Sequence, residues 1–136
     1  MHVLIEAAFT KWITSVFGWL IALVLANGAA VHVGNMLGYG KMPWREFPIA
    51  WKVMDVLLLA FNLTVIAGLA MRQPWGVYVL YAGILTLQFI PYTVFRSHFA
   101  LEPGDAVTLN QLLVTEGVLL AVFAGLIYWQ GHGGGI

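Results

Sequence analysis

Long apolar runs separated by short polar breaks are the dominant pattern of this chain. The runs cover about residues 12–36, 48–71, 75–95 and 106–129. An α-helix needs about 20 apolar residues to cross the hydrocarbon core of a bilayer, and each run reaches that length. The pattern therefore predicts an all-α, polytopic integral membrane protein. We expect one domain over residues 1–136, an antiparallel bundle of four transmembrane helices.

The breaks between the runs carry turn and helix-boundary signals. Pro48 suits the first turn of the second helix, where a missing N–H leaves no bond unmade. Residues 72–74 form a break so short that the second and third helices must form a hairpin. Residues 102–105 are a turn signal, with Asp105 as the expected N-cap of the fourth helix. Pro91 lies inside the third helix and predicts a kink there.

Composition supports the same class. Hydrophobic residues make up 61% of the chain and charged residues only 9%, against about 25% charged in an average soluble domain. A soluble domain of 136 residues has too little interior to bury this much apolar surface. The net charge is zero and cysteine is absent, which excludes disulfides, thiolate metal sites and cysteine nucleophiles. No basic patch is present that would bind nucleic acid.

Charge in the loops gives a weak signal for orientation. An even number of helices places both termini on one side of the membrane and the first and third loops on the other. Lys41, Arg45 and Arg96 lie on the loop side, and Lys11 and Arg72 lie on the terminal side. The positive-inside rule then favours, by a small margin, cytoplasmic loops. As partners we expect the lipid bilayer and either other membrane subunits or a second copy of the chain.

Each predicted helix also contains polar residues that are costly to place in lipid. With a rise of 1.5 Å per residue, one polar residue of each helix lies roughly 10–16 Å from the loop-side end. These residues are Asn27, Asp55, Gln88 and Glu116. They predict a polar layer shared by all four helices, within a cavity that opens toward the loop side.

Further polar side chains are expected around this layer. Lys52 is one turn from Asp55, so its ammonium group is expected to keep that carboxylate ionised. The remaining candidates for the pocket are His32, Tyr92 and Asn62, with Arg96 and His98 at the rim. The layer has two interpretations. It lines a pocket for a small ligand or ion, or its members form interhelical hydrogen bonds, which contribute about 0.6 kcal/mol each on average.

Two cofactors are compatible with these residues. His32 and His98 lie on the same side and offer imidazole nitrogens to a haem, although His98 falls outside the predicted helix. A quinone buries well in an apolar cleft that has few polar anchors. The spacing of His, Asp and Glu follows no local metal-ligand motif, so we predict no metal site.

The first loop carries a resemblance to a known family. Residues 35–39 read Asn-Met-Leu-Gly-Tyr, and residues 41–46 read Lys-Met-Pro-Trp-Arg-Glu. The segment resembles the first-loop region of small membrane subunits of TRAP-type transporters, in which Asn and Arg-Tyr end one helix and Pro-Trp with paired Glu opens the next. Gly38 replaces the Arg and Phe47 replaces the second Glu. The resemblance implies a small transporter subunit.

Three functions remain open from the sequence. We first expect an accessory or anchor subunit of a larger membrane complex with an intramembrane polar pocket, because nearly the whole chain consists of predicted spans. The second function is binding or moving a small lipophilic ligand, quinone or ion. The third and least favoured is a membrane enzyme that uses Asp55 or Glu116 as general acid or base, since no nucleophile motif or phosphate-binding loop is present.

Overall fold

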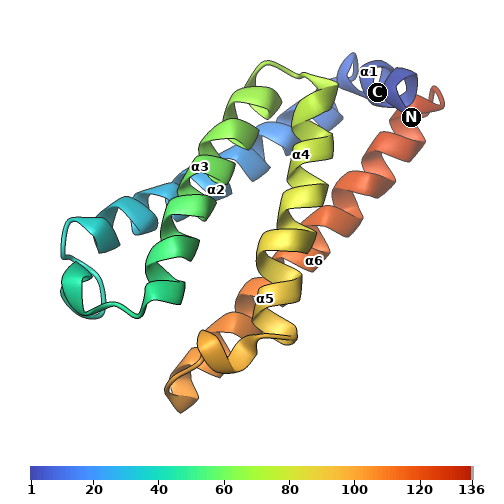
Figure 1. Ribbon diagram of the computed structural model, residues 1–136. Helices are drawn as coiled ribbons and strands as arrows, with labels where there is room; N and C mark the ends of the chain where they lie inside the picture. Colours follow the sequence, from blue (N-terminus) through green and yellow to red (C-terminus); the bar gives the residue numbers. More distant parts are fainter. Residues whose placement is uncertain (136) are drawn as a thin grey trace.

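The computed structural model describes residues 1–135, and the fold is all-helical (Figure 1). The long helices are α2 (Trp12–Met36), α3 (Ile49–Ala70), α4 (Pro74–Ile84) and α6 (Pro103–Gly131). Helix α4 continues through a π-helical turn, η2 (Leu85–Phe89), into α5 (Ile90–Thr93). The short helices are α1 (His2–Phe9), η1 (Trp44–Glu46) and η3 (Arg96–His98). Four helical segments are long and apolar enough to cross a membrane, and residues 1–135 contain no strand.

The ends of α6 differ from the prediction for a local reason. The helix begins at Pro103, one turn earlier than expected from Asp105 as N-cap, so that prediction was wrong. Glu102 is the N-cap, and Pro103 takes the first helical position, where no N–H donor is needed. Asp105 instead lies at the third position, and its Oδ2 accepts hydrogen bonds from the N–H groups of Leu101 and Glu102, both at 3.0 Å. The Asp105 carboxylate therefore still accepts hydrogen bonds from backbone N–H groups at the start of the helix.

Helix α1 was not predicted. It packs against α6, and its inner face buries Ile5, Ala8 and Phe9. Its outer face carries an exposed polar contact between His2 and Glu6, with 3.0 Å between Nε2 and Oε1. The Ser15 hydroxyl donates to the Phe9 carbonyl at 2.9 Å and fixes the junction between α1 and α2. Helix α1 thus covers the end of the molecule where both termini lie (Figure 1).

Neighbouring helices pack along the chain. Helix α2 packs against α3, and α3 packs against α4. The α3–α4 hairpin is very close at Gly68 and Gly76, because a Cβ atom on Gly68 would lie 2.6 Å from the Gly76 Cα. Between α4 and α6 the Tyr81 hydroxyl donates to the Leu120 carbonyl at 2.6 Å. The loops of residues 37–48 and 94–102 lie at the end opposite the termini (Figure 1), which we call the loop side.

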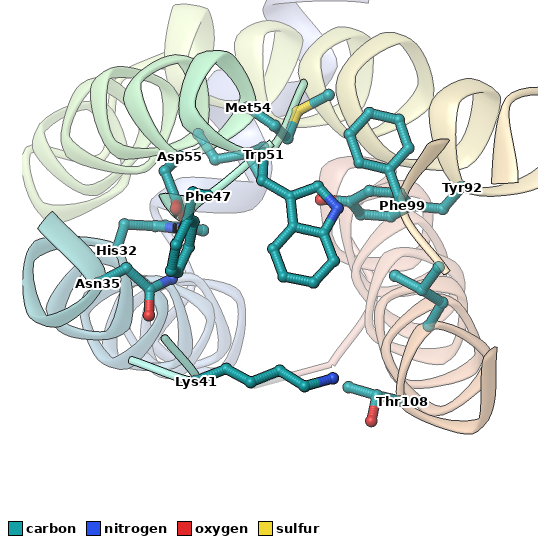
Figure 2. A pocket seen from close by; sticks show the side chains of 12 residues that line it. His32, Asn35, Lys41, Phe47, Trp51, Met54, Asp55, Tyr92, Phe99 and Thr108 are labelled. Atoms are coloured by element: carbon teal, nitrogen blue, oxygen red, sulfur yellow. Dashed lines mark hydrogen bonds and ion pairs between the residues drawn. The ribbon is translucent and has the colours of Figure 1, made fainter. Parts of the chain in front are cut away.

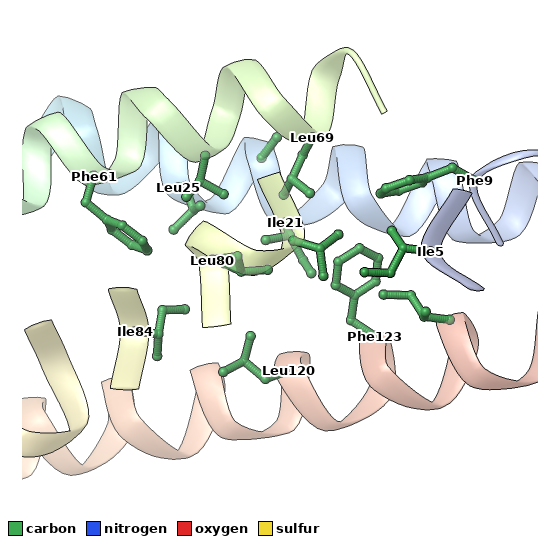
Figure 3. Close-up of a cluster of buried hydrophobic side chains, with 14 of the residues drawn as sticks. Ile5, Phe9, Ile21, Leu25, Phe61, Leu69, Leu80, Ile84, Leu120 and Phe123 are labelled. Atoms are coloured by element: carbon green, nitrogen blue, oxygen red, sulfur yellow. The ribbon is translucent and has the colours of Figure 1, made fainter. Parts of the chain in front are cut away.

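A cluster of buried apolar side chains fills the interior between the helices toward the termini (Figure 3). We call this cluster the terminal core; its central residues are Ile5, Phe9, Ile21, Leu69, Leu80 and Phe123. Phe123 is fully buried, and its ring centroid lies 6.3 Å from that of Phe9 and 5.8 Å from that of Phe17. Next to it, the backbone N–H and hydroxyl of Thr14 both donate to the Gln130 Oε1, at 3.1 and 2.6 Å. The polar groups buried at this end thus bond to one another.

Candidate functional site

A cavity of about 260 Å³ lies on the loop side (Figure 2). Its lining comes from the end of α2, the first loop, the start of α3, the segment around α5 and η3, and the start of α6. The lining residues are His32, Asn35, Lys41, Phe47, Trp51, Met54, Asp55, Leu58, Tyr92, Phe99, Thr108 and Leu109. Aromatic rings make up much of the wall. The Phe47–Trp51 and Tyr92–Phe99 pairs each meet edge to face, at centroid distances of 5.6 and 5.2 Å.

One wall of the cavity is polar and is built around Asp55. This carboxylate is buried, with 6% exposure, and its Oδ1 lies 2.5 Å from the His32 Nδ1. The Asn35 amide donates to both carboxylate oxygens, at 3.2 and 3.3 Å. His32 and Asn35 are three residues apart on α2, so both side chains point to the same face, toward α3. Figure 2 shows the three side chains grouped at one edge of the cavity.

The His32 ring has one nitrogen that the contact with Asp55 does not use. Its Nδ1 bonds to Asp55, and its Nε2 makes no hydrogen bond to any residue between 1 and 135. A neutral ring that donates through Nδ1 has Nε2 as an acceptor, whereas the protonated ring offers Nε2–H as a donor. His32 can therefore accept a hydrogen bond from a hydroxyl group or donate one to a carbonyl group.

Lys41 extends from the first loop across the mouth of the cavity (Figure 2). Its Nζ lies 2.8 Å from the Asp105 Oδ1 and 3.0 Å from the Glu102 Oε2, so it ties the loop to the start of α6. The same ammonium group lies 5.9 Å from the centroid of the Trp51 ring. Hydrogen bonds to Asp105 and Glu102 hold the pKa of Lys41 above its ordinary value of 10.5.

A second buried polar pair joins the π-helical turn to α6. Gln88 and Glu116 are 4% and 7% exposed. With its amide nitrogen turned toward Glu116, Gln88 donates to both carboxylate oxygens, at 2.6 and 2.8 Å. The turn lies just before Pro91, whose missing N–H breaks the regular helical hydrogen-bond pattern. The kink expected at Pro91 thus coincides with a change of helix type.

Tyr92 is influenced by both polar groups. Its ring is buried and lines the cavity, and its hydroxyl is within electrostatic range of both Glu116 and Asp55. The four residues of the predicted layer therefore do not form one cluster. Asp55 bonds to His32 and Asn35 on α2, whereas Gln88 bonds to Glu116 on α6.

Three other predicted pocket residues lie away from the cavity lining. The Lys52 ammonium group donates to the Arg45 carbonyl at 3.3 Å, and it forms no ion pair with Asp55 within residues 1–135, so the expected pairing was wrong. Asn27 is exposed on the outside of α2. Asn62 is buried at 3% exposure beside Gly28, and its Oδ1 has no hydrogen-bond partner among the described residues.

The two rim residues behave differently. Arg96 donates to the Tyr92 carbonyl at 2.9 Å and to the Asn110 Oδ1 at 2.6 Å, so it connects α5 to α6. The His98 ring is exposed beside Phe95, while its backbone carbonyl accepts a hydrogen bond from the Trp51 indole at 3.2 Å. The structure does not bring the His98 ring to the cavity that His32 lines. Residues 1–135 contain no group of three or more His, Cys, Asp or Glu side chains that could hold a metal.

Several residues of the site had no clear signal in the sequence. Trp51 and Phe47 lie among the aromatic residues of a predicted membrane boundary, which usually mark headgroup contacts. For Lys41 the only signal in the sequence was its charge, which does not indicate a place at a cavity. Asn35 is the exception, because its spacing from His32 places it on the same helix face.

No family model matches the chain, and no solved structure matches it. The resemblance of the first loop to small TRAP-type subunits stays a prediction.

Proposed function

We propose that this chain is a multi-pass membrane protein that binds a small lipid-soluble molecule, of the quinone class, through its loop-side cavity. The observation that carries this proposal is the His32–Asn35–Asp55 group, which lines a cavity with aromatic walls and in which the His32 Nε2 makes no hydrogen bond within residues 1–135. A buried carboxylate that only braced two helices would need no cavity beside it. Few polar anchors in an otherwise apolar pocket are typical of sites for lipophilic ligands.

The volume of the cavity limits what enters it. About 260 Å³ is slightly below the usual range of about 300–1,000 Å³ for small-molecule pockets. A single substituted ring fits this space, and an apolar tail would lie along the helices outside. A quinone ring carries carbonyl groups and its reduced form carries hydroxyl groups, and His32 can bond to either. The edge-to-face aromatic pairs of the wall suit a flat ring.

Insertion in a bilayer is part of this proposal. The four long helices have the required length and hydropathy, and large apolar side chains such as Leu23, Leu63 and Val118 face outward. In lipid these faces need no protein cover. We place the four helices antiparallel across the membrane, with both termini on one side. Arg45, Lys41 and Arg96 favour a cytoplasmic loop side.

Purification from membranes in a mild detergent tests the proposal. Mass spectrometry and an absorption spectrum of the purified full chain should show a bound molecule of this class. A water-soluble short-chain quinone should then quench tryptophan fluorescence in a saturable way, because Trp51 lines the cavity. Asp55→Asn should weaken the affinity about tenfold, which corresponds to about 1.4 kcal/mol.

Matched variants locate the effect. Asn27→Ala removes a polar side chain outside the cavity and should leave the affinity unchanged. Trp51→Phe should remove most of the fluorescence signal. Equal affinities of Asp55→Asn and Asn27→Ala, or quenching that never saturates, would contradict binding at this site.

A second candidate function is that of an accessory subunit. Asn27 lies on the exposed face of α2 and makes no hydrogen bond to residues 1–135. Ala26, Ala30 and Gly34 follow one another at intervals of four residues on this side of the helix. A polar amide in lipid favours contact with another helix, and small residues permit a close approach. The same purification tests this function: a monomer without a partner chain contradicts it.

A further inference from the structure

Glu116 is a carboxyl group that the cavity does not use. It lies deep within α6 and is buried, and no cation within residues 1–135 lies at ion-pair distance from it. Among residues 1–135 its single hydrogen-bonding partner is the Gln88 amide, which the π-helical turn presents to it. Wide turns of this kind occur frequently at functional sites. A buried acid without a cation is also costly as a purely structural element.

The Gln88 amide can satisfy Glu116 in either protonation state. When Glu116 is a carboxylate, the amide nitrogen donates to its two oxygens, at 2.6 and 2.8 Å. When the acid is protonated, its O–H donates to the amide oxygen after a half-turn of the amide. The two ends of an amide group have nearly the same size, so the half-turn leaves the packing unchanged. An amide partner therefore fits a group that gains and loses a proton.

Few other charged or titratable groups face Glu116. From α5, the Tyr92 hydroxyl is in electrostatic range, and from α3 Asp55 acts on the same hydroxyl. Arg96 gives its donors to the Tyr92 carbonyl and to Asn110. From α2, His32 bonds to Asp55. Tyr92 also lines the loop-side cavity, so one buried side chain is shared between that cavity and the surroundings of Glu116.

We propose that Glu116 is a proton-binding site, held by Gln88 in both protonation states and reached from the loop-side cavity past Tyr92. On uptake, a proton from water adds to the carboxylate, and the amide of Gln88 turns from donor to acceptor. On release both changes reverse, and no electron transfer is involved. The change of one charge then acts on Tyr92 and the cavity. This inference does not require that the cavity binds a quinone.

Infrared difference spectroscopy on the full chain in lipid nanodiscs tests it. Between about pH 4 and about pH 9, the carbonyl-stretch band of a protonated carboxylic acid in an apolar site should appear on the acid side. Glu116→Gln should abolish this band. Glu6→Gln is the matched control, because Glu6 is exposed at the far end of the molecule, and the band should be unchanged.

Further variants keep the test decisive. Glu116→Asp retains a carboxyl group but draws it away from Gln88, so the band should shift in frequency. Gln88→Leu removes the amide, so it should also shift the frequency of the band. Circular dichroism and thermal unfolding establish that each variant is folded. A wild-type chain with no such band, a band that survives in folded Glu116→Gln, or a band unmoved in Glu116→Asp and Gln88→Leu would overturn the proposal.

Discussion

The two ends of this molecule use the same helices for different purposes. At the terminal end, α1 covers the bundle, and the terminal core is closed around Phe123. On the loop side, the helices leave a cavity of about 260 Å³ with a polar wall. A pocket of about 640 Å³ also lies beside the terminal core, between α1, α4 and α6, and it is lined by apolar and tyrosine side chains. Overall apolar composition is common to both ends. The two ends therefore differ in what lines their open space: an imidazole, an amide and a carboxylate on the loop side, and apolar and tyrosine side chains at the terminal end.

Buried polar groups make the contrast sharper. At the terminal end, Gln130 accepts both hydrogen bonds of Thr14, and neither residue lines the pocket of about 640 Å³ there. On the loop side, Asp55 is satisfied by α2, but His32 keeps a ring nitrogen without a protein partner. The Thr14–Gln130 arrangement joins α2 to α6. The His32–Asp55 arrangement leaves one hydrogen-bonding position unused in a residue that lines the cavity.

The largest expected difference between the two ends concerns packing. Phe123→Ala should lower the free energy of unfolding by about 3 kcal/mol, because its fully buried ring leaves a void that neighbours cannot fill. Phe99→Ala removes the same ring from the cavity wall and should cost only about 1 kcal/mol, because its ring already borders empty space. Unfolding in mixed detergent micelles measures both. Equal losses would show that the two ends are packed alike.

A smaller effect concerns Lys41, which ties the first loop across the cavity. Its pKa is raised above 10.5 by hydrogen bonds to Asp105 and Glu102. The ion pairs therefore stabilise the loop below pH 10.5 and are lost as the pH rises through the higher value. The unfolding temperature of the wild type should decrease at alkaline pH, and that of Lys41→Met should not. Added salt should make this decrease smaller, because the ion pairs are exposed.

The neighbouring residue Arg45 provides the control for this effect. It lies in the same loop and forms no ion pair within residues 1–135. Arg45→Met should therefore keep the alkaline decrease. If Lys41→Met also keeps it, the ion pairs do not hold the loop.

Much of the helical framework followed from the apolar pattern alone. The four long segments were predicted to within a few residues, because their length and hydropathy are properties of consecutive residues. Helix α1 was missed because its eight residues are too few to stand out, and because its helix is stabilised by packing against α6. The start of α6 was misplaced because Pro103 and Asp105 are both compatible with a helix start.

The site was predictable in its residue types but not in its pairings. His32 and Asp55 were both candidates, yet their contact depends on how α2 and α3 are rotated about their axes. Lys52 was expected to pair with Asp55 because it is one turn away, but its long side chain reaches the Arg45 carbonyl instead. Pairing between helices depends on relative rotation and depth. The spacing of residues within one helix determines neither the relative rotation nor the relative depth of two helices.

Solvent access to single cysteines tests most directly whether the loop side is hollow and the terminal core is closed. The chain has no cysteine, so Met54→Cys in the cavity wall and Leu80→Cys in the terminal core need no further changes. A water-soluble maleimide should label Met54→Cys in membrane vesicles open to the loop side, and a short-chain quinone should slow this labelling. Leu80→Cys should remain unlabelled. Equal labelling of both positions, or none at Met54→Cys, would contradict the account.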